Sequence, residues 1–299
     1  KNWLENQEHL FYLFLFILIV PNMVLCFTEP LPFMAKVANV LLPFGCYYLL
    51  MTLSRNCGKM LWILFLFLFF GAFQIVLLYL FGQSIIAVDM FLNLVTTNSS
   101  EALELLDNLT PAIIAVIILY VPALILGTIS IIRKRKLTVE FIRRERKRAF
   151  LVFGISLLSL VGAYVQDSGY ELKSDLYPLN VCYNVGLAFQ RTALTQDYHR
   201  TSKDFTFHAR PTHPEGKREV YVMVIGETSR ALNWQLYGYE RETTPLLSRQ
   251  TGLIAFPKVL TESNTTHKSV PMLMSDATAC NYDSIYHQKG IITAFKEAG

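Results

Sequence analysis

Long apolar runs separated by short polar segments fill the first half of the chain. Five of these runs approach the length needed to cross the roughly 30 Å hydrocarbon core of a bilayer. They cover residues 10–28, 32–53, 60–82, 111–132 and 149–165, the last being the shortest. No small-residue cleavage pattern follows the first run, so we expect a membrane anchor there and not a removable signal peptide. The pattern predicts five transmembrane helices within residues 1–165.

After residue 165 the pattern is that of a connector followed by a water-soluble domain. Residues 166–216 contain an amphipathic run at 181–194 and a proline-rich linker, which predict a bridging helix along the membrane surface. In residues 217–299, β-favouring runs alternate with stretches of helical character. The expected strands are 219–225 and 253–259, and the expected helices lie near 229–237, 245–250, 266–273 and 287–299, with a turn at Gly238.

This alternation predicts a parallel sheet with helices on its faces, which is the α/β class. The stretch is short for a doubly wound fold, so we expect the sheet to be incomplete in this chain. Although 53% of all residues are hydrophobic, the excess lies almost entirely before residue 166. We therefore expect two bodies, namely a membrane α-helical domain of five transmembrane helices and the N-terminal part of an external α/β domain.

The basic residues are concentrated in two of the short loops. Nine of the 27 Lys and Arg lie between Arg133 and Arg148, and Arg55 and Lys59 flank another loop. The loop at 83–110 has acidic residues and no Lys or Arg. Because basic loops stay in the cytoplasm, the N-terminus is predicted to be cytoplasmic and the chain after about residue 166 external. The basic cluster indicates a loop facing the membrane, so we expect no nucleic-acid partner.

Two polar residues follow the predicted strands. Glu227 comes directly after the first strand, where a carboxylate is either a metal ligand or an N-cap partner of the next segment. Thr266 opens a predicted helix, so its hydroxyl either caps that helix or acts as a nucleophile on a bound phosphate. Thr265 is the second choice for the nucleophile. Since parallel strands end at one edge of a sheet, Glu227 and Thr266 could share one metal ion there.

A third polar pattern lies in the acidic loop. Asn93, Thr97 and Glu101 have the i, i+4, i+8 spacing that forms one stripe on a helix. The stripe is either the solvated face of an interfacial helix or a contact surface for a lipid head group.

Three motifs together resemble the phosphoethanolamine transferases. They are Gly226-Glu-Thr-Ser-Arg230, Tyr237-Gly-Tyr-Glu-Arg241-Glu-Thr-Thr-Pro245 and Thr266-His-Lys-Ser-Val-Pro271-Met. The family consists of inner-membrane enzymes of the alkaline phosphatase/sulfatase superfamily, and it includes the lipid A-modifying enzymes that give polymyxin resistance. The resemblance implies a zinc-dependent transferase of the bacterial inner membrane with a periplasmic catalytic domain. We expect it to act as a monomer.

The resemblance also assigns roles to the candidate residues. Glu227 and Thr266 would hold zinc, and Thr266 would take phosphoethanolamine from phosphatidylethanolamine and pass it to lipid A or another envelope glycan. Asn93, Thr97 and Glu101 would bind substrate. Arg230, Tyr237 and Arg241 belong to the recognisable motifs and are interpreted as structural support.

The chain departs from the family in three respects. His267 and Lys268 follow the threonine directly, where a helical turn would point them away from the metal. The family's Asp and His metal ligands are expected beyond residue 299, so we expect a C-terminally truncated chain that is inactive by itself. The cysteines that flank the threonine loop in many members are replaced by Glu262 and Met272, so that disulfide is absent. Whether Cys182 and Cys280 pair is left open.

Two other functions are compatible with these patterns. One is glycerol phosphate transfer of the lipoteichoic acid synthase type, which also combines five spans with a threonine nucleophile. The other is a non-catalytic membrane subunit that binds or transports lipids, although Lys36 is almost the sole ionisable residue inside the predicted spans.

Overall fold

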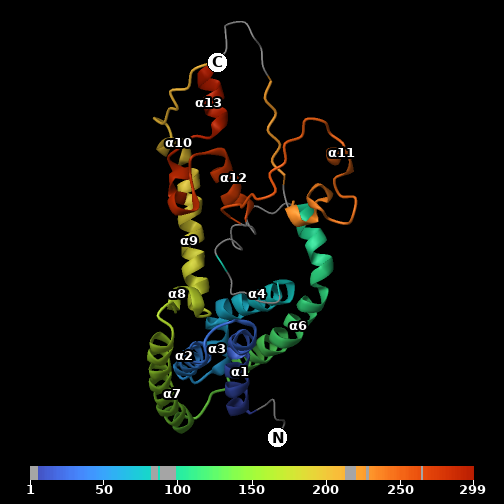
Figure 1. The fold of residues 1–299 in the computed structure, drawn as a ribbon. Coiled ribbons are helices and arrows are strands. Elements are labelled where there is room, and N and C mark those ends of the chain that lie inside the picture. Colours follow the sequence, from blue (N-terminus) through green and yellow to red (C-terminus); the bar gives the residue numbers. More distant parts are fainter. Residues whose placement is uncertain (1–5, 82–86, 88–98, 213–219, 227–228, 264) are drawn as a thin grey trace. The chain divides into compact units, whose positions relative to one another are not determined.

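The computed structural model describes residues 6–81, 87, 99–212, 220–226, 229–263 and 265–299. The chain divides into two compact units, a membrane unit (Lys1–Gln190) and a C-terminal unit (Arg191–Gly299) (Figure 1). The predicted division into a transmembrane domain (1–165), a bridging segment (166–216) and a catalytic part (217–299) uses other boundaries and stays a prediction.

The described part of the membrane unit is built from helices (Figure 1). They are α1 (Gln7–Thr28), α2 (Phe33–Met51), α3 (Cys57–Ile63), α4 (Phe65–Phe81), α6 (Ser99–Ile132), α7 (Val139–Gln166) and α8 (Leu172–Asp175), followed by α9 (Leu179–Gln196), which runs on into the C-terminal unit. Among the described residues, four segments are long and apolar enough to cross a membrane: Gln7–Thr28, Phe33–Met51, Leu109–Ile132 and Val139–Gln166. Four of the five predicted runs therefore coincide with helices long enough to span a membrane.

The third predicted span is broken. Cys57–Ile63 and Phe65–Leu80 form a pair of helices bent by 62°, and this pair supplies a fifth span only if it crosses as one unit. A chain of five spans remains a prediction.

The predicted basic loop is shorter in the structure than in the sequence-based assignment. Residues 133–138 form the loop, and α7 already begins at Val139, so most of the basic residues up to Arg148 lie on its first turns. Thr138 starts this helix, because its Oγ1 accepts a hydrogen bond of 3.1 Å from the N–H of Phe141. Arg, Lys and Glu are good helix formers, which explains why the charged segment is helical.

One end of the membrane unit carries both basic loops, and we call it the basic end (loops 52–56 and 133–138). The N–H of Leu137 donates to the carbonyl of Arg55 at 2.7 Å, and Nε of Arg55 donates to the carbonyl of Leu137 at 2.9 Å. Near the start of α1, Ser130 Oγ donates to Gln7 Oε1 at 2.6 Å. The chain start and the two basic loops thus lie together, as the predicted alternation requires.

The basic end also buries a carboxylate. Glu145 of α7 is fully buried, and the hydroxyl of Tyr48 on α2 donates to its Oε2 at 2.5 Å. Arg144 and Arg148 donate to its Oε1 at 2.8 and 2.9 Å. A buried charge is tolerated when it is paired and hydrogen-bonded, so this group ties α2 to α7.

The opposite end holds the connector. Asn22 of α1 donates to the carbonyls of Asn39 and Tyr177 at 2.9 and 2.7 Å, and Asn39 of α2 donates to the carbonyl of Asp175 at 2.6 Å. The hydroxyl of Tyr170 donates to Asn39 Oδ1 at 2.5 Å. These buried side chains satisfy backbone groups of the connector and fix it to the first two helices. The connector then continues into α9, which confirms the amphipathic helix expected at 181–194.

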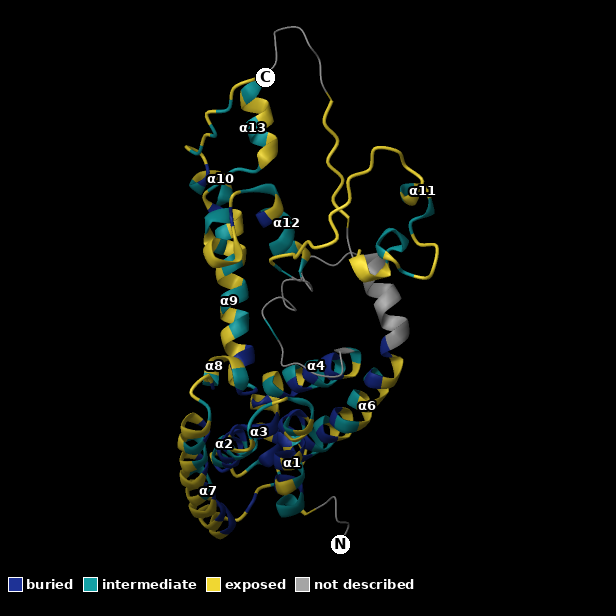
Figure 2. Cartoon of the chain, in the orientation of Figure 1, coloured by how far each residue is buried: buried dark blue, intermediate teal, exposed yellow. Residues whose placement is uncertain are grey.

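The described residues of the C-terminal unit form short helical elements joined by extended segments (Figure 2). The elements are α10 (Tyr198–Thr201), η2 (Ala231–Asn233), η3 (Gln235–Tyr237), α11 (Pro245–Ser248), α12 (Thr266–Met274), η4 (Ala279–Tyr286) and α13 (Ile291–Ala298). The helices expected near 245–250, 266–273 and 287–299 are confirmed with shifted ends. The single helix expected at 229–237 is instead two 3₁₀ turns, and η4 was not anticipated.

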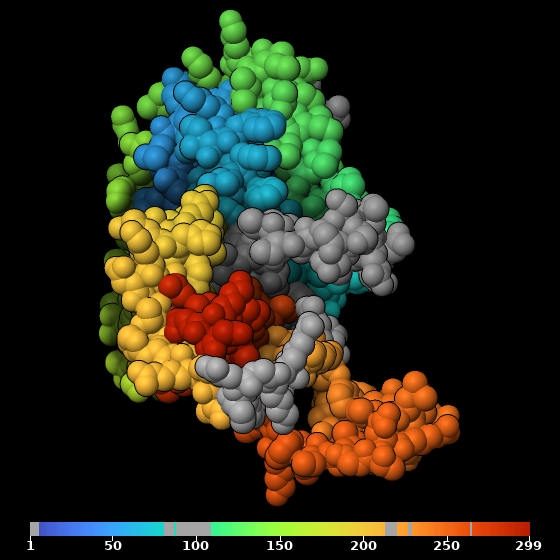
Figure 3. Space-filling model, turned by 90° about the horizontal axis from the view of Figure 1, so that it is seen from above, coloured from blue at the N-terminus to red at the C-terminus, as the bar shows by residue number. Residues whose placement is uncertain are grey.

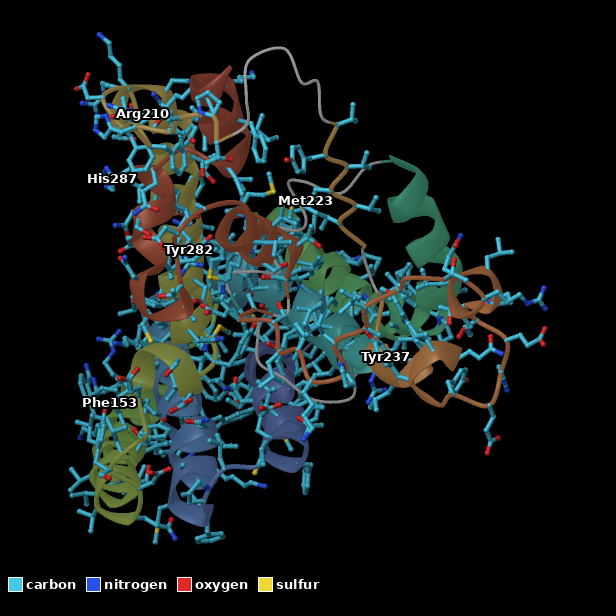
Figure 4. The ribbon with its side chains drawn as sticks, turned by 45° about the horizontal axis from the view of Figure 1, so that its top comes forward. Phe153, Arg210, Met223, Tyr237, Tyr282 and His287 are labelled. Carbon is cyan, nitrogen blue, oxygen red and sulfur yellow. The ribbon has the colours of Figure 1, made fainter. Side chains whose placement is uncertain are left out.

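The predicted strands are not confirmed, because residues 220–226 and 253–259 form no strand in the described part of the chain, and the α/β class stays a prediction. Val222 and Val224 are 80% and 85% exposed, and Met223 between them is 56% exposed (Figure 4). A strand is stabilised by ladder hydrogen bonds and by side chains that cover its faces. In the described residues the run forms no strand ladder, although a ring contact joins Tyr221 to Phe295, so its composition alone does not produce a sheet.

Candidate functional site

The candidate site is centred on the start of α12. Thr265 is the N-cap residue, with extended backbone angles of φ −128° and ψ 138°. Its carbonyl accepts hydrogen bonds from the N–H groups of Lys268 and Ser269 at 3.1 and 2.9 Å, which closes the first turn. Thr266 is therefore the first helical residue, and its side chain is exposed. This confirms the predicted position of Thr266 at a helix N-terminus.

Hydroxyl groups organise the loop before α12. Thr261 Oγ1 donates to the carbonyl of Ser263 at 2.8 Å, and the hydroxyls of Ser263 and Thr265 are 3.3 Å apart. Glu262 Oε2 accepts a short hydrogen bond from the N–H of Ala279, the first residue of η4. A carboxylate at the start of a helical segment is favoured by the partial positive charge there. Glu262 thus holds the threonine loop against η4 by a non-covalent contact.

A hollow of about 560 Å³ lies beside this loop. It is lined by Arg191, Thr261, Glu262, Ser263, Lys268, Met272, Ala279 and Tyr282. The guanidinium carbon of Arg191 is 5.8 Å from the centre of the Tyr282 ring, on η4, which is the geometry of a cation–π contact (Figure 4). Two cations, three hydroxyl-bearing side chains and one carboxylate therefore border one opening next to the helix that Thr266 begins.

The wall of this hollow is supported by packing inside the C-terminal unit. The hydroxyls of Tyr198 and Thr201 donate to the carbonyls of Gln288 and Tyr286, the first at 3.0 Å. Lys289 Nζ donates to two carbonyls, those of Lys203 and Phe205, at 3.0 and 2.9 Å.

Burial raises the pKa of the Tyr286 phenol above its usual value, so the side chain stays neutral near pH 7. In Figure 3 the red C-terminal residues lie against the yellow segment, to which Tyr198 and Thr201 belong.

The second motif forms a compact turn. Gly238 closes η3 with a φ of +95°, a conformation that favours glycine. Thr243 and Thr244 accept hydrogen bonds from the N–H groups of Gln235 and Leu236 at 3.0 and 3.1 Å. Tyr237 donates to the carbonyl of Phe256 at 3.3 Å. These contacts fit the structural role predicted for the motif, and the turn expected at Gly238 is confirmed.

Most of the other predicted site residues fall outside the described residues. This holds for Glu227, Asn93 and Thr97. Glu101 lies on α6, but its side chain is not described either. The juxtaposition of Glu227 and Thr266 is thus still a prediction.

Within the described residues, no three His, Cys, Asp or Glu side chains come close enough together to hold a metal ion. These residues therefore do not form a zinc site on their own. The five cysteines, all in described segments, are free.

Two residues at the hollow were missed by the sequence interpretation. Arg191 belongs to an amphipathic helix and Tyr282 to a 3₁₀ element that had not been expected, and neither stands in a recognisable motif. Glu262 carried a weak signal, because it occupies a place that holds a cysteine in many transferases. Lys268 was expected to point away from the metal, and it lines the hollow.

Residues 219–299 match the family described as Sulfatase. The phosphoethanolamine transferase EptA of Escherichia coli is 34% identical over 87 residues, which cover 28% of this chain and 16% of the relative. The phosphatidylethanolamine transferase Mcr-1 of Escherichia coli is 30% identical over 137 residues, or 43% of this chain and 24% of the relative. Mcr-2, also from Escherichia coli, is 30% identical over 128 residues, or 41% and 23%.

No solved structure matches the chain. The matched parts span between about a sixth and a quarter of the lengths of these curated relatives. Residues 219–299 thus form part of a sulfatase domain of the alkaline phosphatase/sulfatase superfamily, and the chain is homologous over part of its length to the phosphoethanolamine transferases.

Proposed function

We propose that this chain is part of a membrane-bound enzyme that transfers phosphoethanolamine from phosphatidylethanolamine to lipid A or another glycan of the cell envelope. The observation that carries the proposal is the position of Thr266. It is the first residue of α12, in the segment that matches the sulfatase family, and Ser263 and Lys268, which lie on either side of it in the sequence, line a hollow. The similarity to transferases with this donor in their names supports the choice of substrate.

Thr266 is the proposed nucleophile. Its Oγ1 attacks the phosphorus of phosphatidylethanolamine, an O–P bond forms, and the bond from phosphorus to the diacylglycerol oxygen breaks. The proton of the hydroxyl leaves with diacylglycerol, which departs as the free alcohol. In the second half of the reaction an acceptor oxygen attacks the same phosphorus, and Thr266 recovers its proton from the acceptor.

The start of α12 suits this role. The first N–H groups of a helix point out of its N-terminus, and the helix dipole favours negative charge there. Phosphoryl oxygens are stabilised by such an arrangement. The proposal therefore places the phosphoryl group of the donor over the first turn of α12.

Zinc is the proposed cofactor, with Glu227 and Thr266 as two of its ligands. A bound zinc ion lowers the pKa of a hydroxyl group and neutralises charge on phosphoryl oxygens. Structural and catalytic zinc sites use three or four protein ligands, so further donors are required.

The hollow beside α12 is the proposed site for the polar head group. Its volume of about 560 Å³ lies within the usual range of small-molecule sites. Arg191 and Lys268 are suited to a phosphate, because guanidinium and ammonium groups form charge-assisted hydrogen bonds with phosphoryl oxygens.

The apolar helices of the membrane unit fit an enzyme with lipid substrates. We propose that it resides in a bacterial inner membrane as a monomer, with its basic end in the cytoplasm and the sulfatase domain in the periplasm. Asn93 and Thr97, which precede α6 in the sequence, and Glu101, which lies on it, are the proposed contacts of the membrane unit with substrate.

A transfer assay tests this function. The full-length protein to which this chain belongs, in bacterial membranes, is supplied with phosphatidylethanolamine labelled in its head group, and label in lipid A and release of diacylglycerol are measured. Thr266→Ala is expected to lower both by about a thousandfold or more, because the attacking oxygen is lost. Thr265→Ala is the matched control and retains transfer.

The assay also separates the alternatives. Release of diacylglycerol from phosphatidylglycerol, with none from phosphatidylethanolamine, would replace the proposal by glycerol phosphate transfer. Full activity in Thr266→Ala would remove Thr266 from its role.

A further inference from the structure

The basic end of the membrane unit has a hollow of its own, which the proposed reaction does not use. It has a volume of about 260 Å³ and lies between the end of α2 and the first turns of α7. It is lined by Leu49, Leu50, Thr52, Leu53, Arg146 and Phe150. We call it the α2–α7 groove. Four of its six lining residues are large and apolar, and one carries a positive charge.

The apolar side of the groove is open to the surroundings. Leu53 is 66% exposed and Phe150 is 61% exposed, whereas Leu49 and Leu50 are half-buried beneath them. Figure 2 shows the corresponding exposed strip along α7. On a helix that crosses a membrane, such side chains contact acyl chains of the lipid. The volume is slightly below that of sites for drug-sized molecules, so it fits part of a hydrocarbon chain.

Arg146 stands at the polar rim of this groove. One of its terminal nitrogens donates to the carbonyl of Thr52 at 2.7 Å, which caps the C-terminal end of α2. A guanidinium group has five N–H donors, so this bond leaves most of them for another acceptor. The bond also holds the guanidinium beside the apolar wall that Leu53 forms.

The neighbouring arginines differ from Arg146 in their partners. Arg144 and Arg148 both pair with the buried carboxylate of Glu145. In the described part of the chain, Arg146 pairs with no carboxylate, and its bonded partner is the uncharged carbonyl of Thr52. Its positive charge is therefore available to an anion.

The wider surroundings of the groove are strongly cationic. Nine Lys and Arg occupy residues 133–148, against two acidic residues, Glu140 and Glu145. One of these two, Glu145, is buried beneath its own arginine partners. Clusters of this kind beside a transmembrane helix attract anionic lipids, at roughly 1 kcal/mol per basic residue near the membrane surface.

We propose that the α2–α7 groove binds one anionic phospholipid, with an acyl chain along Leu53 and Phe150 and its phosphate on Arg146. The required chemistry is a hydrocarbon chain joined to a phosphodiester whose negative charge has no ammonium group beside it. Phosphatidylglycerol has this chemistry, whereas phosphatidylethanolamine carries a compensating cation. The site is independent of the transfer reaction and of its donor.

Native mass spectrometry of the protein in a neutral detergent tests the proposal. The protein is titrated with phosphatidylglycerol and, separately, with phosphatidylethanolamine of the same acyl chains, and the fraction carrying one bound lipid is measured. The first lipid is expected to bind about tenfold more tightly, as one charge-assisted contact implies.

Two matched pairs of variants locate the site. Arg146→Gln keeps a donor for the Thr52 carbonyl and removes the charge, and it is expected to abolish most of the tenfold preference. Lys147→Gln removes a positive charge next to the groove, and it should change the preference for phosphatidylglycerol by less than about twofold. Leu53→Ala is expected to weaken the binding of both lipids several-fold, because the acyl chain loses an apolar contact. Leu151→Ala has little effect, although Leu151 is also 66% exposed, because it does not line the groove.

Arg146→Lys guards against a folding defect, since it keeps the charge and is expected to keep the preference. Equal binding of the two lipids would overturn the proposal. An equal loss of the preference for phosphatidylglycerol in Arg146→Gln and Lys147→Gln would overturn it too. Diffuse attraction to a basic surface would then explain the binding without a specific site.

Discussion

The two units of this chain bury their hydrophobic residues very differently. The core of the membrane unit draws on α1, α2, α3, α4, α6 and α7 and includes large side chains such as Phe11, Phe14 and Phe141. In the described part of the C-terminal unit, the buried hydrophobic residues are Met272, Ala277 and Tyr286. Apolar side chains at 220–225, which the same kind of pattern predicted to be a core strand, lie exposed.

The difference follows from how each secondary structure is stabilised. A helix makes its backbone hydrogen bonds within its own segment, so an apolar run of sufficient length specifies it. A strand makes them with a neighbour, so the run at 220–225 needs partners from elsewhere in the chain. The membrane helices are thus specified largely by local sequence, whereas the predicted strand at 219–225 would also depend on distant parts of the chain.

The first way to test this contrast is at the closest helix crossing. Gly58 on α3 faces Gly127 on α6, and a Cβ at residue 58 would overlap the carbonyl oxygen of Gly127. Gly58→Ala is therefore expected to lower the free energy of unfolding of the membrane unit by about 3 kcal/mol, the upper end of overpacking effects. Thermal unfolding in detergent measures it.

Gly154→Ala on α7 is the matched control. A Cβ there would meet no atom within 4 Å, and alanine is the better helix former, so no loss of stability is expected. Equal effects of the two substitutions would contradict the tight crossing of α3 and α6.

The second test concerns the buried carboxylate of the basic end. Glu145→Ala leaves the hydroxyl of Tyr48 without its acceptor and removes the partner of Arg144 and Arg148, so we expect a loss of about 2 kcal/mol. The exposed arginines can be solvated, which keeps the loss below that of a fully buried ion pair. Glu140→Ala, at an exposed position of the same helix, should cost less than about 0.5 kcal/mol. Chemical denaturation compares the free energies of unfolding of the two variants. An equally small loss in Glu145→Ala would argue against a stabilising role of the contacts between Glu145, Tyr48, Arg144 and Arg148.

The third test concerns the C-terminal unit, where no effect is expected to exceed that of the second test. Met272→Ala removes a buried side chain and is expected to destabilise this unit by about 2 kcal/mol. Val222→Ala truncates an 80% exposed side chain and should change its stability by less than about 0.5 kcal/mol. Limited proteolysis reports both. A larger loss of stability in Val222→Ala than in Met272→Ala would indicate that the run at 220–225 is part of a core, as the sequence predicted.

The sequence predicted the helices of the membrane unit well and their ends less well. The clearest error was the loop at 133–148, because the charged residues of α7 resemble a loop in hydropathy although Arg, Lys and Glu favour helix. The bend of 62° between α3 and α4 has no counterpart in hydropathy, because the apolar run continues through Leu64, where the two helices meet.

The candidate site was predictable only where a local motif marked it. The start of α12 at Thr266 and the turn at Gly238 follow from short-range sequence signals. Arg191 and Tyr282 reach the hollow from separate elements, and no spacing rule connects residues so far apart in sequence. The same holds for Arg146 and Leu53 at the α2–α7 groove.

The central claim is that Thr266 carries the transferred group. Its most direct test is mass analysis of peptides from the full-length protein to which this chain belongs. The protein is first incubated with phosphatidylethanolamine and without an acceptor. The account predicts a phosphoethanolamine adduct on Thr266 that persists in Thr265→Ala and disappears in Thr266→Ala. An adduct on another residue, or one that survives the loss of the Thr266 hydroxyl, would contradict it.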